Sequence, residues 1–271
     1  MLLADRTAVV TGAASGIGLA LTERLLAEGM SVVMADIETD RLDQEYRRLA
    51  DDGAAVTAVP CDVADAAQVA ALRDAAVSAH GAVHLLCNNA GVASGRPNHK
   101  TRPEVWDWVV GVNLLGPAYG CSLFAPLMVE QGEGHIVNTA SEAGLASTPM
   151  LGSYHATKYG VVGLSESLRM ELEGTGVGVS CLCPELVDTR IFESTRNAPA
   201  ELGFKPPAHV PVDQLEQFMG SKAMNPADVA GQVVYAVQAD RFWIITHQVT
   251  HQRVARRHAD VEQFRNPTFR P

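Results

Sequence analysis

The sequence lacks the features of membrane proteins and of nucleic-acid-binding proteins. No apolar run in its 271 residues approaches the roughly 18 residues that a membrane-spanning helix needs, so we expect no membrane partner. Basic residues are in deficit, because 21 Lys and Arg stand against 31 Asp and Glu and leave a net charge of -10. Binding to phosphates needs clustered basic side chains, and the short group Arg253, Arg256 and Arg257 does not reverse that balance. We therefore expect no nucleic-acid partner.

Signals for secretion, disulfides and metal binding are also missing. Met1 leads into an apolar strand pattern without a basic region or cleavage site, so we expect a cytoplasmic protein. The five cysteines form no C-x-x-C pair, and their scattered positions in apolar segments are typical of small buried hydrophobic side chains. His247 and His251 are four residues apart, but no third ligand completes a motif. We predict no metal site there, only a solvated helix face.

Short apolar runs alternate with longer amphipathic stretches along the chain. The runs predict strands at 7–11, 31–35, 54–59, 83–87, 135–139, 177–182 and 242–246. The stretches predict helices at 16–28, 39–51, 66–80, 106–130, 154–173 and 226–238. Strands separated by helical crossovers indicate an α/β fold: a doubly wound, Rossmann-type, seven-stranded parallel sheet with helices on both faces. We expect a single domain over 1–271, because nearly every connection is short.

Two segments depart from this alternation. The connection 190–224 is long, carries four prolines and mixes apolar with polar residues, which favours a lid over the substrate. The segment 247–271 forms a C-terminal tail that is partly helical in pattern.

A glycine-rich segment follows the first predicted strand. It has the sequence Thr11-Gly12-Ala13-Ala14-Ser15-Gly16-Ile17-Gly18. Glycines let the chain turn tightly and bring a pyrophosphate close to the N–H groups at a helix N-terminus. A lone cluster of this kind is equally typical of a tight turn.

Asp36 favours the cofactor interpretation. It lies 18 residues beyond Gly18 at the end of the second predicted strand, near the spacing at which an acid receives ribose hydroxyls. A carboxylate there repels a 2'-phosphate, so NAD is favoured over NADP. The alternative is that Asp36 caps the next helix, a role that Thr39 or Asp40 could also take.

A second group of residues suggests proton transfer. Tyr154 and Lys158 are four residues apart on one helix face, and a nearby ammonium is a plausible means of lowering the phenol pKa. Tyr-x-x-x-Lys alone is common and usually structural. Ser141 follows the fifth predicted strand, and Asn113 lies in the preceding helical stretch. Taken alone, a serine at such a position more often caps a turn than takes part in catalysis, and an asparagine within a helix more often faces water.

Together these motifs resemble the short-chain dehydrogenase/reductase family in its compact single-domain form. The resemblance runs from residue 5 to near residue 245 and includes Asp62 and the sequence Asn88-Asn89-Ala90-Gly91. It implies that Tyr154 is the acid/base and that Lys158 lowers its pKa and holds the nicotinamide ribose. It also implies that Ser141 bonds the reacting oxygen and that Asn113 supports a water-linked proton path.

The same resemblance extends the expected cofactor site. Asp62 and Val63 are expected to border the adenine, Asn89 the adjacent ribose region, and Val187 and Thr189 the nicotinamide carboxamide. The full set of cofactor-binding residues that we predict is Gly12, Ser15, Gly16, Ile17, Gly18, Asp36, Asp62, Val63, Asn89, Ala90, Gly91, Tyr154, Lys158, Pro184, Val187 and Thr189.

The chain departs from the family at two acids and at the C-terminus. Pro184 is followed by Glu185 where the family usually has glycine, and Glu142 follows Ser141. Both carboxylates could reach a polar substrate group, but we expect them to point to solvent. The tail 247–271 replaces a glycine-rich ending.

These observations predict an NAD(H)-dependent oxidoreductase that transfers a hydride between nicotinamide and a secondary alcohol or ketone. Apolar residues in 190–224 favour a hydrophobic or aromatic substrate. The alternative is a non-catalytic dinucleotide sensor or scaffold on the same fold. The segment 154–173 has more small and apolar residues than one buried helix face requires. This excess predicts a homodimer through this helix and 114–128, with a homotetramer as the alternative.

Overall fold

A seven-stranded parallel sheet forms the centre of the molecule. The computed structural model describes residues 1–205, 209–219 and 221–268. The strands are β1 (Thr7–Thr11), β2 (Ser31–Asp36), β3 (Val56–Pro60), β4 (Leu85–Asn88), β5 (Gly134–Thr139), β6 (Val177–Cys183) and β7 (Trp243–Ile245). Their order in the sheet is β3-β2-β1-β4-β5-β6-β7, and every neighbouring pair is parallel. The predicted fold class is confirmed, with strand ends displaced by one or two residues.

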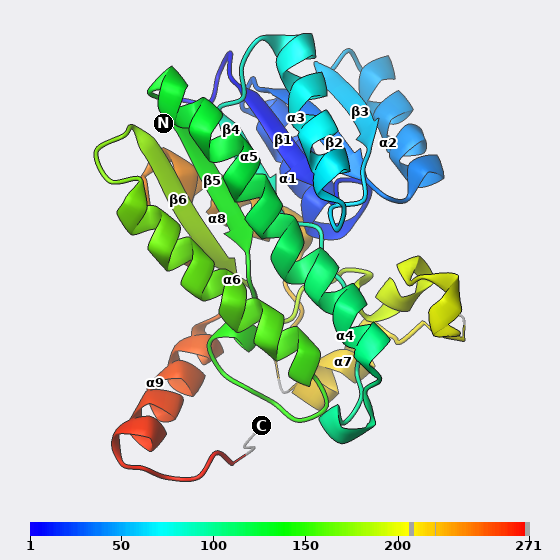
Figure 1. The fold of residues 1–271 in the computed structure, drawn as a ribbon, viewed down its shortest axis with the longest axis vertical. Coiled ribbons are helices and arrows are strands. Elements are labelled where there is room, and N and C mark those ends of the chain that lie inside the picture. Colours follow the sequence, from blue (N-terminus) through cyan, green and yellow to red (C-terminus); the bar gives the residue numbers. More distant parts are fainter. Residues whose placement is uncertain (206–208, 220, 269–271) are drawn as a thin grey trace.

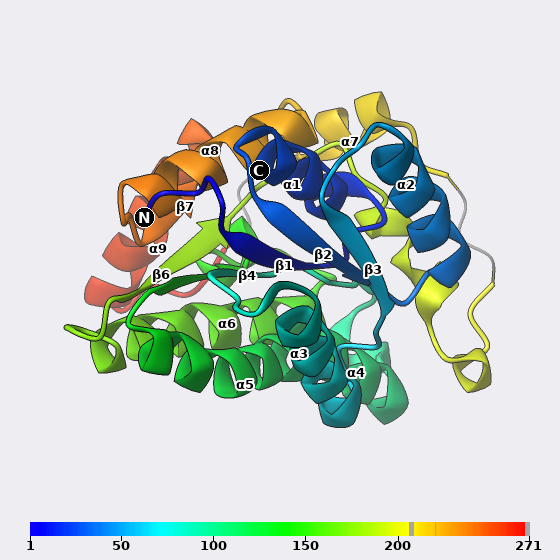
Figure 2. The same ribbon diagram turned by 90° about the horizontal axis from the view of Figure 1, so that it is seen from above.

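Helices cover both faces of the sheet (Figures 1 and 2). One face carries α1 (Gly16–Ala27), α2 (Thr39–Asp51) and α8 (Pro226–Gln238). The other carries α3 (Ala66–His80), α4 (Pro103–Val110), α5 (Gly116–Gln131) and α6 (Gly152–Glu171). Beyond the layers lie α7 (Val212–Met219) and α9 (Gln248–Glu262).

Alternation along β1 shows how the sequence builds two cores. Ala8 and Val10 belong to the apolar cluster under α1 and α8, whereas Val9 belongs to the cluster under α3 and α5. Successive side chains of a strand point to opposite faces, so a continuous apolar run serves both layers. Each buried valine contributes about 1.5–3 kcal/mol relative to exposure.

Local signals set several helix ends. The Asp65 carboxylate accepts the Ala67 N–H at the start of α3, and Gly81 ends that helix in the left-handed region with a φ of 77°. The Asn225 side chain accepts the Ala227 N–H at the start of α8. These caps fix where α3 starts and ends and where α8 starts, so the connections to the neighbouring strands are short.

The helical run Pro103–Gln131 is, by length and composition, the one membrane-span candidate among the described residues. It consists of α4, a π-helical segment (Gly111–Leu115) and α5. Phe124 and Met128 of this run are fully buried in the core beneath the sheet. The apolar composition of this helical run is therefore explained by its packing against the sheet.

Candidate active site

A cavity of about 1520 Å³ opens where the strands end at their carboxyl side. It exceeds the roughly 300–1,000 Å³ of a typical single-ligand pocket. Loops after β1, β2, β3, β4, β5 and β6 line it, together with 191–197 and α9. The space therefore suits a dinucleotide and a second molecule.

The glycine segment forms one end of the cavity. Gly16 has a φ of 55°, a left-handed conformation that side chains other than glycine rarely adopt. A Cβ on Gly18 would lie 2.0 Å from the Gly12 carbonyl oxygen, so that position also requires glycine. The Asn89 amide donates to the Thr11 carbonyl oxygen at 3.0 Å and holds the segment from the side. This backbone cradle fits the pyrophosphate of a dinucleotide.

Asp36 lies beside the cradle. One carboxylate oxygen accepts the Ala14 N–H and the other accepts the Glu38 N–H, each at 2.9 Å. Burial raises the pKa of Asp36, and these backbone hydrogen bonds oppose the rise. The helix α2 starts one residue after Glu38, so Asp36 is not its N-cap residue, and Asp36 lines the cavity as the ribose interpretation requires.

Glu38 is a site residue that sequence reasoning missed. Its carboxylate pairs with Arg196 at 2.6 Å and with Arg190 at 3.6 Å, and it accepts from the Asn197 amide at 2.8 Å. These partners lie about 150 residues away along the chain, at the start of the predicted lid. The pairing ties 191–197 to the loop after β2, on the Asp36 side of the cavity.

The remaining predicted cofactor residues mostly line the same cavity. They are Ser15, Ile17, Asp62, Val63, Asn89, Ala90, Gly91, Pro184, Val187 and Thr189. Gly18 does not line it and serves the close packing of the cradle. The contacts that each lining residue makes with a cofactor stay predictions.

Ser141, Tyr154 and Lys158 meet where β5 ends. Ser141 Oγ accepts the Ala143 N–H at 3.1 Å and donates to the Pro184 carbonyl oxygen at 3.2 Å. Burial raises the pKa of Tyr154, and a hydrogen bond with Ser141 lowers it. Lys158 Nζ donates to the Thr139 carbonyl oxygen at 2.7 Å and lies 5.6 Å from the centre of the Tyr154 ring.

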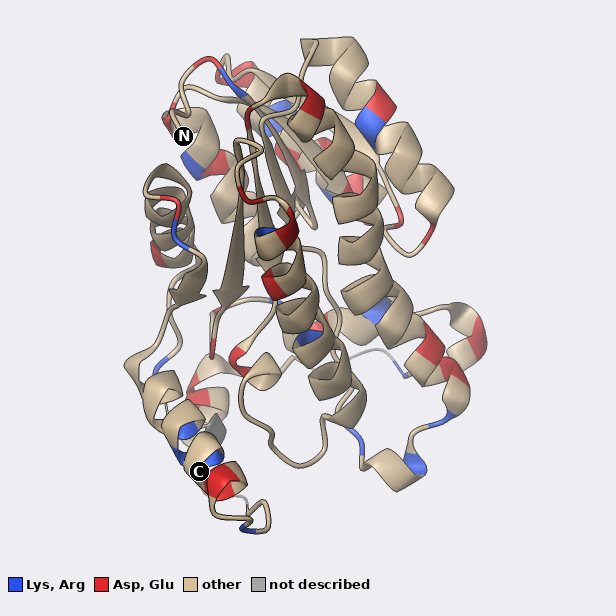
Figure 3. Ribbon diagram, turned by 60° about the vertical axis from the view of Figure 1, so that its left-hand side comes forward, with Lys and Arg blue, Asp and Glu red and all other residues tan. Residues whose placement is uncertain are grey.

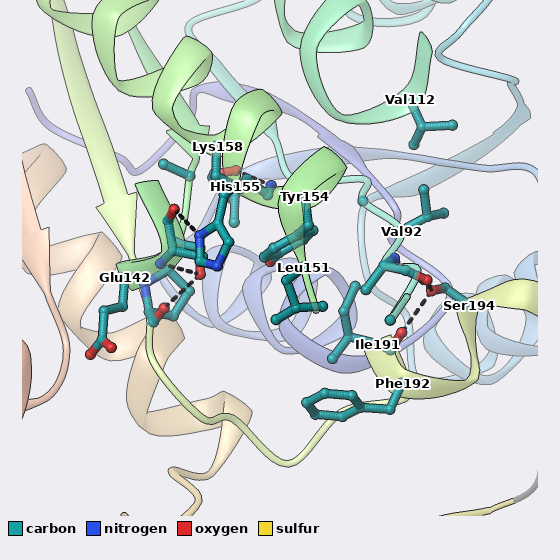
Figure 4. A pocket seen from close by; sticks show the side chains of 18 of the residues that line it. Val92, Val112, Glu142, Leu151, Tyr154, His155, Lys158, Ile191, Phe192 and Ser194 are labelled. Atoms are coloured by element: carbon teal, nitrogen blue, oxygen red, sulfur yellow. Dashed lines mark hydrogen bonds between the residues drawn. The ribbon is translucent and has the colours of Figure 1, made fainter. Parts of the chain in front are cut away.

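Burial lowers the pKa of Lys158 to about 8. The cause is that burial in a site of low dielectric disfavours the charged ammonium. Figure 4 shows Lys158 and Tyr154 next to one another on α6. The expected lowering of the Tyr154 pKa by Lys158 stays a prediction, since burial and Ser141 are the two causes that act on that phenol in the structure.

Asn113 lies in the π-helical segment and is fully buried. Its side chain accepts the Val92 N–H and donates to the Val92 carbonyl oxygen, both at 2.8 Å. It also donates to Thr157 Oγ1 at 3.3 Å, which links it to α6. The alternative of a solvated asparagine is therefore excluded, and the expected proton path through it stays a prediction.

His155 is a second residue that sequence reasoning missed. Its Nε2 accepts the Thr148 N–H at 2.9 Å, so its Nδ1–H donates to the Ala143 carbonyl oxygen at 2.7 Å. Figure 4 shows it beside Tyr154. The sequence shows that His155 follows Tyr154, but no nearby motif predicts that its side chain ties the loop 143–148 to α6.

The expectation that Glu142 and Glu185 point to solvent is wrong. The side chains are 7% and 1% exposed, and Arg253 Nη1 of α9 lies 2.6 Å from Glu142 and 3.1 Å from Glu185. Thr250 Oγ1 donates to Glu142 at 2.6 Å, and Ser221 donates to Glu185. Buried carboxylates need such partners, and these lie in the tail and in 221–224.

The expected solvated face at His247 is also wrong. His247 precedes α9, its side chain is 11% exposed, and it contacts Thr246 Oγ1 and the Lys222 carbonyl oxygen. His251 is exposed as expected. Within residues 1–205, 209–219 and 221–268 no group of three His, Cys, Asp or Glu residues is arranged to hold a metal ion.

The segment 190–224 borders the cavity with Ile191, Phe192 and Ser194, whose side chains Figure 4 shows. Ser194 Oγ accepts the Ala93 N–H at 2.8 Å, which joins this segment to the loop after β4. Residues 206–208 and 220 of the expected lid lie outside the described residues.

A parallel sheet with a dinucleotide cradle and a Ser-Tyr-Lys group at its carboxyl edge defines a nicotinamide-dependent oxidoreductase. The family model for short chain dehydrogenases matches residues 6–200. The chain belongs to that family, and it transfers a hydride between a nicotinamide dinucleotide and an alcohol or ketone.

Three relatives illustrate the similarity. The chain is 36% identical over 264 residues to 1-deoxy-11-beta-hydroxypentalenate dehydrogenase of Streptomyces exfoliatus, covering 96% of this chain and 90% of that protein. It is 41% identical, with a TM-score of 0.93, to a short-chain dehydrogenase/reductase from Burkholderia phymatum in complex with NAD, covering 100% and 99% of the chains. An actinorhodin polyketide ketoreductase with NADPH is 30% identical, with a TM-score of 0.78 over 89% and 95%.

Proposed function

We propose that this oxidoreductase uses NAD(H) in preference to NADP(H) and acts on a secondary alcohol or ketone with a largely apolar body. The single observation that carries the proposal is the position of Asp36, buried at the end of β2 with its carboxylate fixed beside the glycine cradle. A 2'-phosphate would meet the Asp36 carboxylate, since Asp36 lines that part of the cavity. The Burkholderia phymatum relative, solved with NAD, supports this choice.

The chain's residues divide the work of hydride transfer between binding and proton movement. The glycine cradle and Asp36 fit the pyrophosphate and a ribose, and the nicotinamide ring supplies or accepts the hydride when the dinucleotide is bound. Tyr154 Oη gives a proton to the carbonyl oxygen or takes one from the hydroxyl, and Ser141 Oγ hydrogen-bonds the same oxygen. The ammonium of Lys158 stabilises the phenolate form electrostatically.

The rest of the cavity sets the character of the substrate. Large apolar side chains from five places in the chain line it: Trp108 of α4, Leu151 before α6, Phe192, Leu202, and Leu215 of α7. They exclude water from the reacting carbon and favour an apolar ligand.

Nicotinamide absorbance tests the proposal. The protein is incubated with NAD or NADP and a panel of secondary alcohols, and in reverse with the reduced cofactors and ketones. Wild type is compared with Tyr154→Phe and with Tyr235→Phe, an exposed tyrosine of α8 remote from the cavity. Turnover with NAD in wild type and Tyr235→Phe, and its loss in Tyr154→Phe, is the expected result.

If neither direction gives turnover although NAD binds by calorimetry, the non-catalytic sensor becomes the better interpretation. If NADP is used as well as NAD, the argument from Asp36 fails while the reaction class stands.

A homodimer through α5 and α6 is our proposal for the assembly, with a homotetramer as the alternative. Leu115, Val129 and Met170 are large apolar residues of this region that are 38%, 39% and 70% exposed in the single chain. Light scattering on the purified protein tests this, and a monomer would exclude it.

A cytoplasmic location is likewise proposed, and fractionation of the source cells tests it.

A further inference from the structure

One face of α9 forms a wall of the substrate end of the cavity. The residues of α9 that line it are Arg253, Arg256, Arg257, Asp260 and Val261. Their spacing of three and four residues places them on a single helix face. Figure 3 shows basic residues gathered along this helix, so the wall brings several cations to the edge of the cavity.

The acids near this wall already have cationic partners. Arg253 lies between Glu142 and Glu185, and Asp260 pairs with Arg265 at 2.6 Å. Those contacts fix the position of α9 without using Arg256 or Arg257.

Arg256 and Arg257 are exposed cations on the cavity wall. Among the described residues, no carboxylate lies within ion-pair distance of either guanidinium. Arg257 packs over the Tyr159 ring at 5.2 Å. This cation–π contact helps to fix the position of the Arg257 guanidinium on the cavity wall.

The other acids of the cavity lie elsewhere. Glu38 is paired with Arg196 at the adenosine end. Glu104 and Asp107 belong to α4, on the opposite side of the molecule from α9 in both Figure 1 and Figure 2. Arg256 and Arg257 therefore add two guanidinium groups, without an ion-pair partner among the described residues, to the α9 end of the cavity.

We propose that Arg256 and Arg257 bind an oxyanion, a carboxylate or a phosphate, at the end of the substrate remote from its reacting hydroxyl or ketone. This rests on the proposed function and adds the substrate class: an apolar molecule with one anionic end. Guanidinium groups bind such oxyanions through paired, charge-assisted hydrogen bonds. The apolar lining of the cavity holds the body of the molecule.

Binding of unreactive probes tests the charge recognition apart from turnover. Dodecanoate, dodecyl phosphate and dodecanol share one apolar chain and differ in the end group. Calorimetry with the NAD-loaded protein measures the affinity of each, at low and at high salt. We expect at least one anion to bind about 10-fold more tightly than dodecanol, with the difference reduced by salt because an exposed ion pair is screened.

Matched variants locate the effect. The double variant Arg256→Gln/Arg257→Gln is expected to remove the preference for the anion and leave the affinity for dodecanol within about two-fold, since it keeps the apolar lining. Arg47→Gln is the control, because Arg47 is 71% exposed on α2 and away from the cavity. Arg257→Lys keeps the charge and loses the planar fork, so it should retain part of the preference.

Each outcome decides the proposal. A preference that the double variant removes and the control keeps supports it, and the stronger of the two anions identifies carboxylate or phosphate. Equal affinities for dodecanol and both anions, or a preference that survives in the double variant, overturn it. Either of those results leaves NAD-dependent turnover of neutral alcohols, and hence the proposed function, intact.

Discussion

Removing Arg253 should destabilise the protein strongly, because it is the guanidinium between two buried carboxylates. Glu142 and Glu185 lie 2.6 and 3.1 Å from Arg253 Nη1, and the three side chains are 7%, 1% and 14% exposed. Breaking a buried pair by removing one partner costs roughly 3–5 kcal/mol, since it leaves an uncompensated buried charge. Arg253→Gln should therefore lose about 3–5 kcal/mol of unfolding free energy.

Urea unfolding at neutral pH, followed by circular dichroism, measures this loss. Arg47→Gln, which removes an exposed pair of α2, should change stability by less than about 1 kcal/mol. The triple variant Glu142→Gln/Glu185→Gln/Arg253→Met removes all three charges and should recover part of the loss. A loss below about 1 kcal/mol in Arg253→Gln would refute the reasoning, because it would mean that water reaches both carboxylates.

Three further results are expected. Asp36→Asn should reduce the ratio of kcat/KM for NAD over NADP by about 10-fold or more, because the carboxylate no longer repels a 2'-phosphate; an unchanged ratio would exclude that role. His155→Phe should raise KM more than it lowers kcat, because it frees the loop 143–148 from α6 while leaving Tyr154 in place; equal loss of kcat and of kcat/KM would contradict this. Burial lowers the pKa of His135 to about 4, although Asp240 opposes the shift, so the unfolded chain binds the extra proton below pH 6.5. Stability should therefore fall as the pH drops from 6.5 to 4, by up to about 3 kcal/mol from this group, and His135→Gln should flatten that slope in urea unfolding; parallel slopes for the two proteins would count against it.

Periodicity in the sequence predicts the central sheet well. The apolar run at β1 serves two cores, so its composition identifies a buried parallel strand, and the glycine segment follows it at once. Tyr154 and Lys158 share one helix face, a relation that sequence spacing captures. These features depend on residues near one another in the chain.

The errors concern pairs that are distant in the sequence. Glu142 and Arg253 are 111 residues apart, and Glu38 and Arg196 are 158 apart. An isolated acid in a sequence is expected to face water, because burial without a partner is costly. The partner becomes visible once the fold places the tail against the loops after β5 and β6.

Because α9 lies outside the part of the chain that carries the hydride-transfer residues, substitutions in α9 and substitutions at those residues affect different properties of the protein. The family model ends at residue 200, so it includes the hydride-transfer group and excludes the whole wall formed by α9. That wall contacts the loops after β5 and β6 through a few side chains around Arg253. Substitutions on its exposed face can therefore alter which molecules enter without disturbing the chemistry, so ligand choice and catalysis can diverge independently.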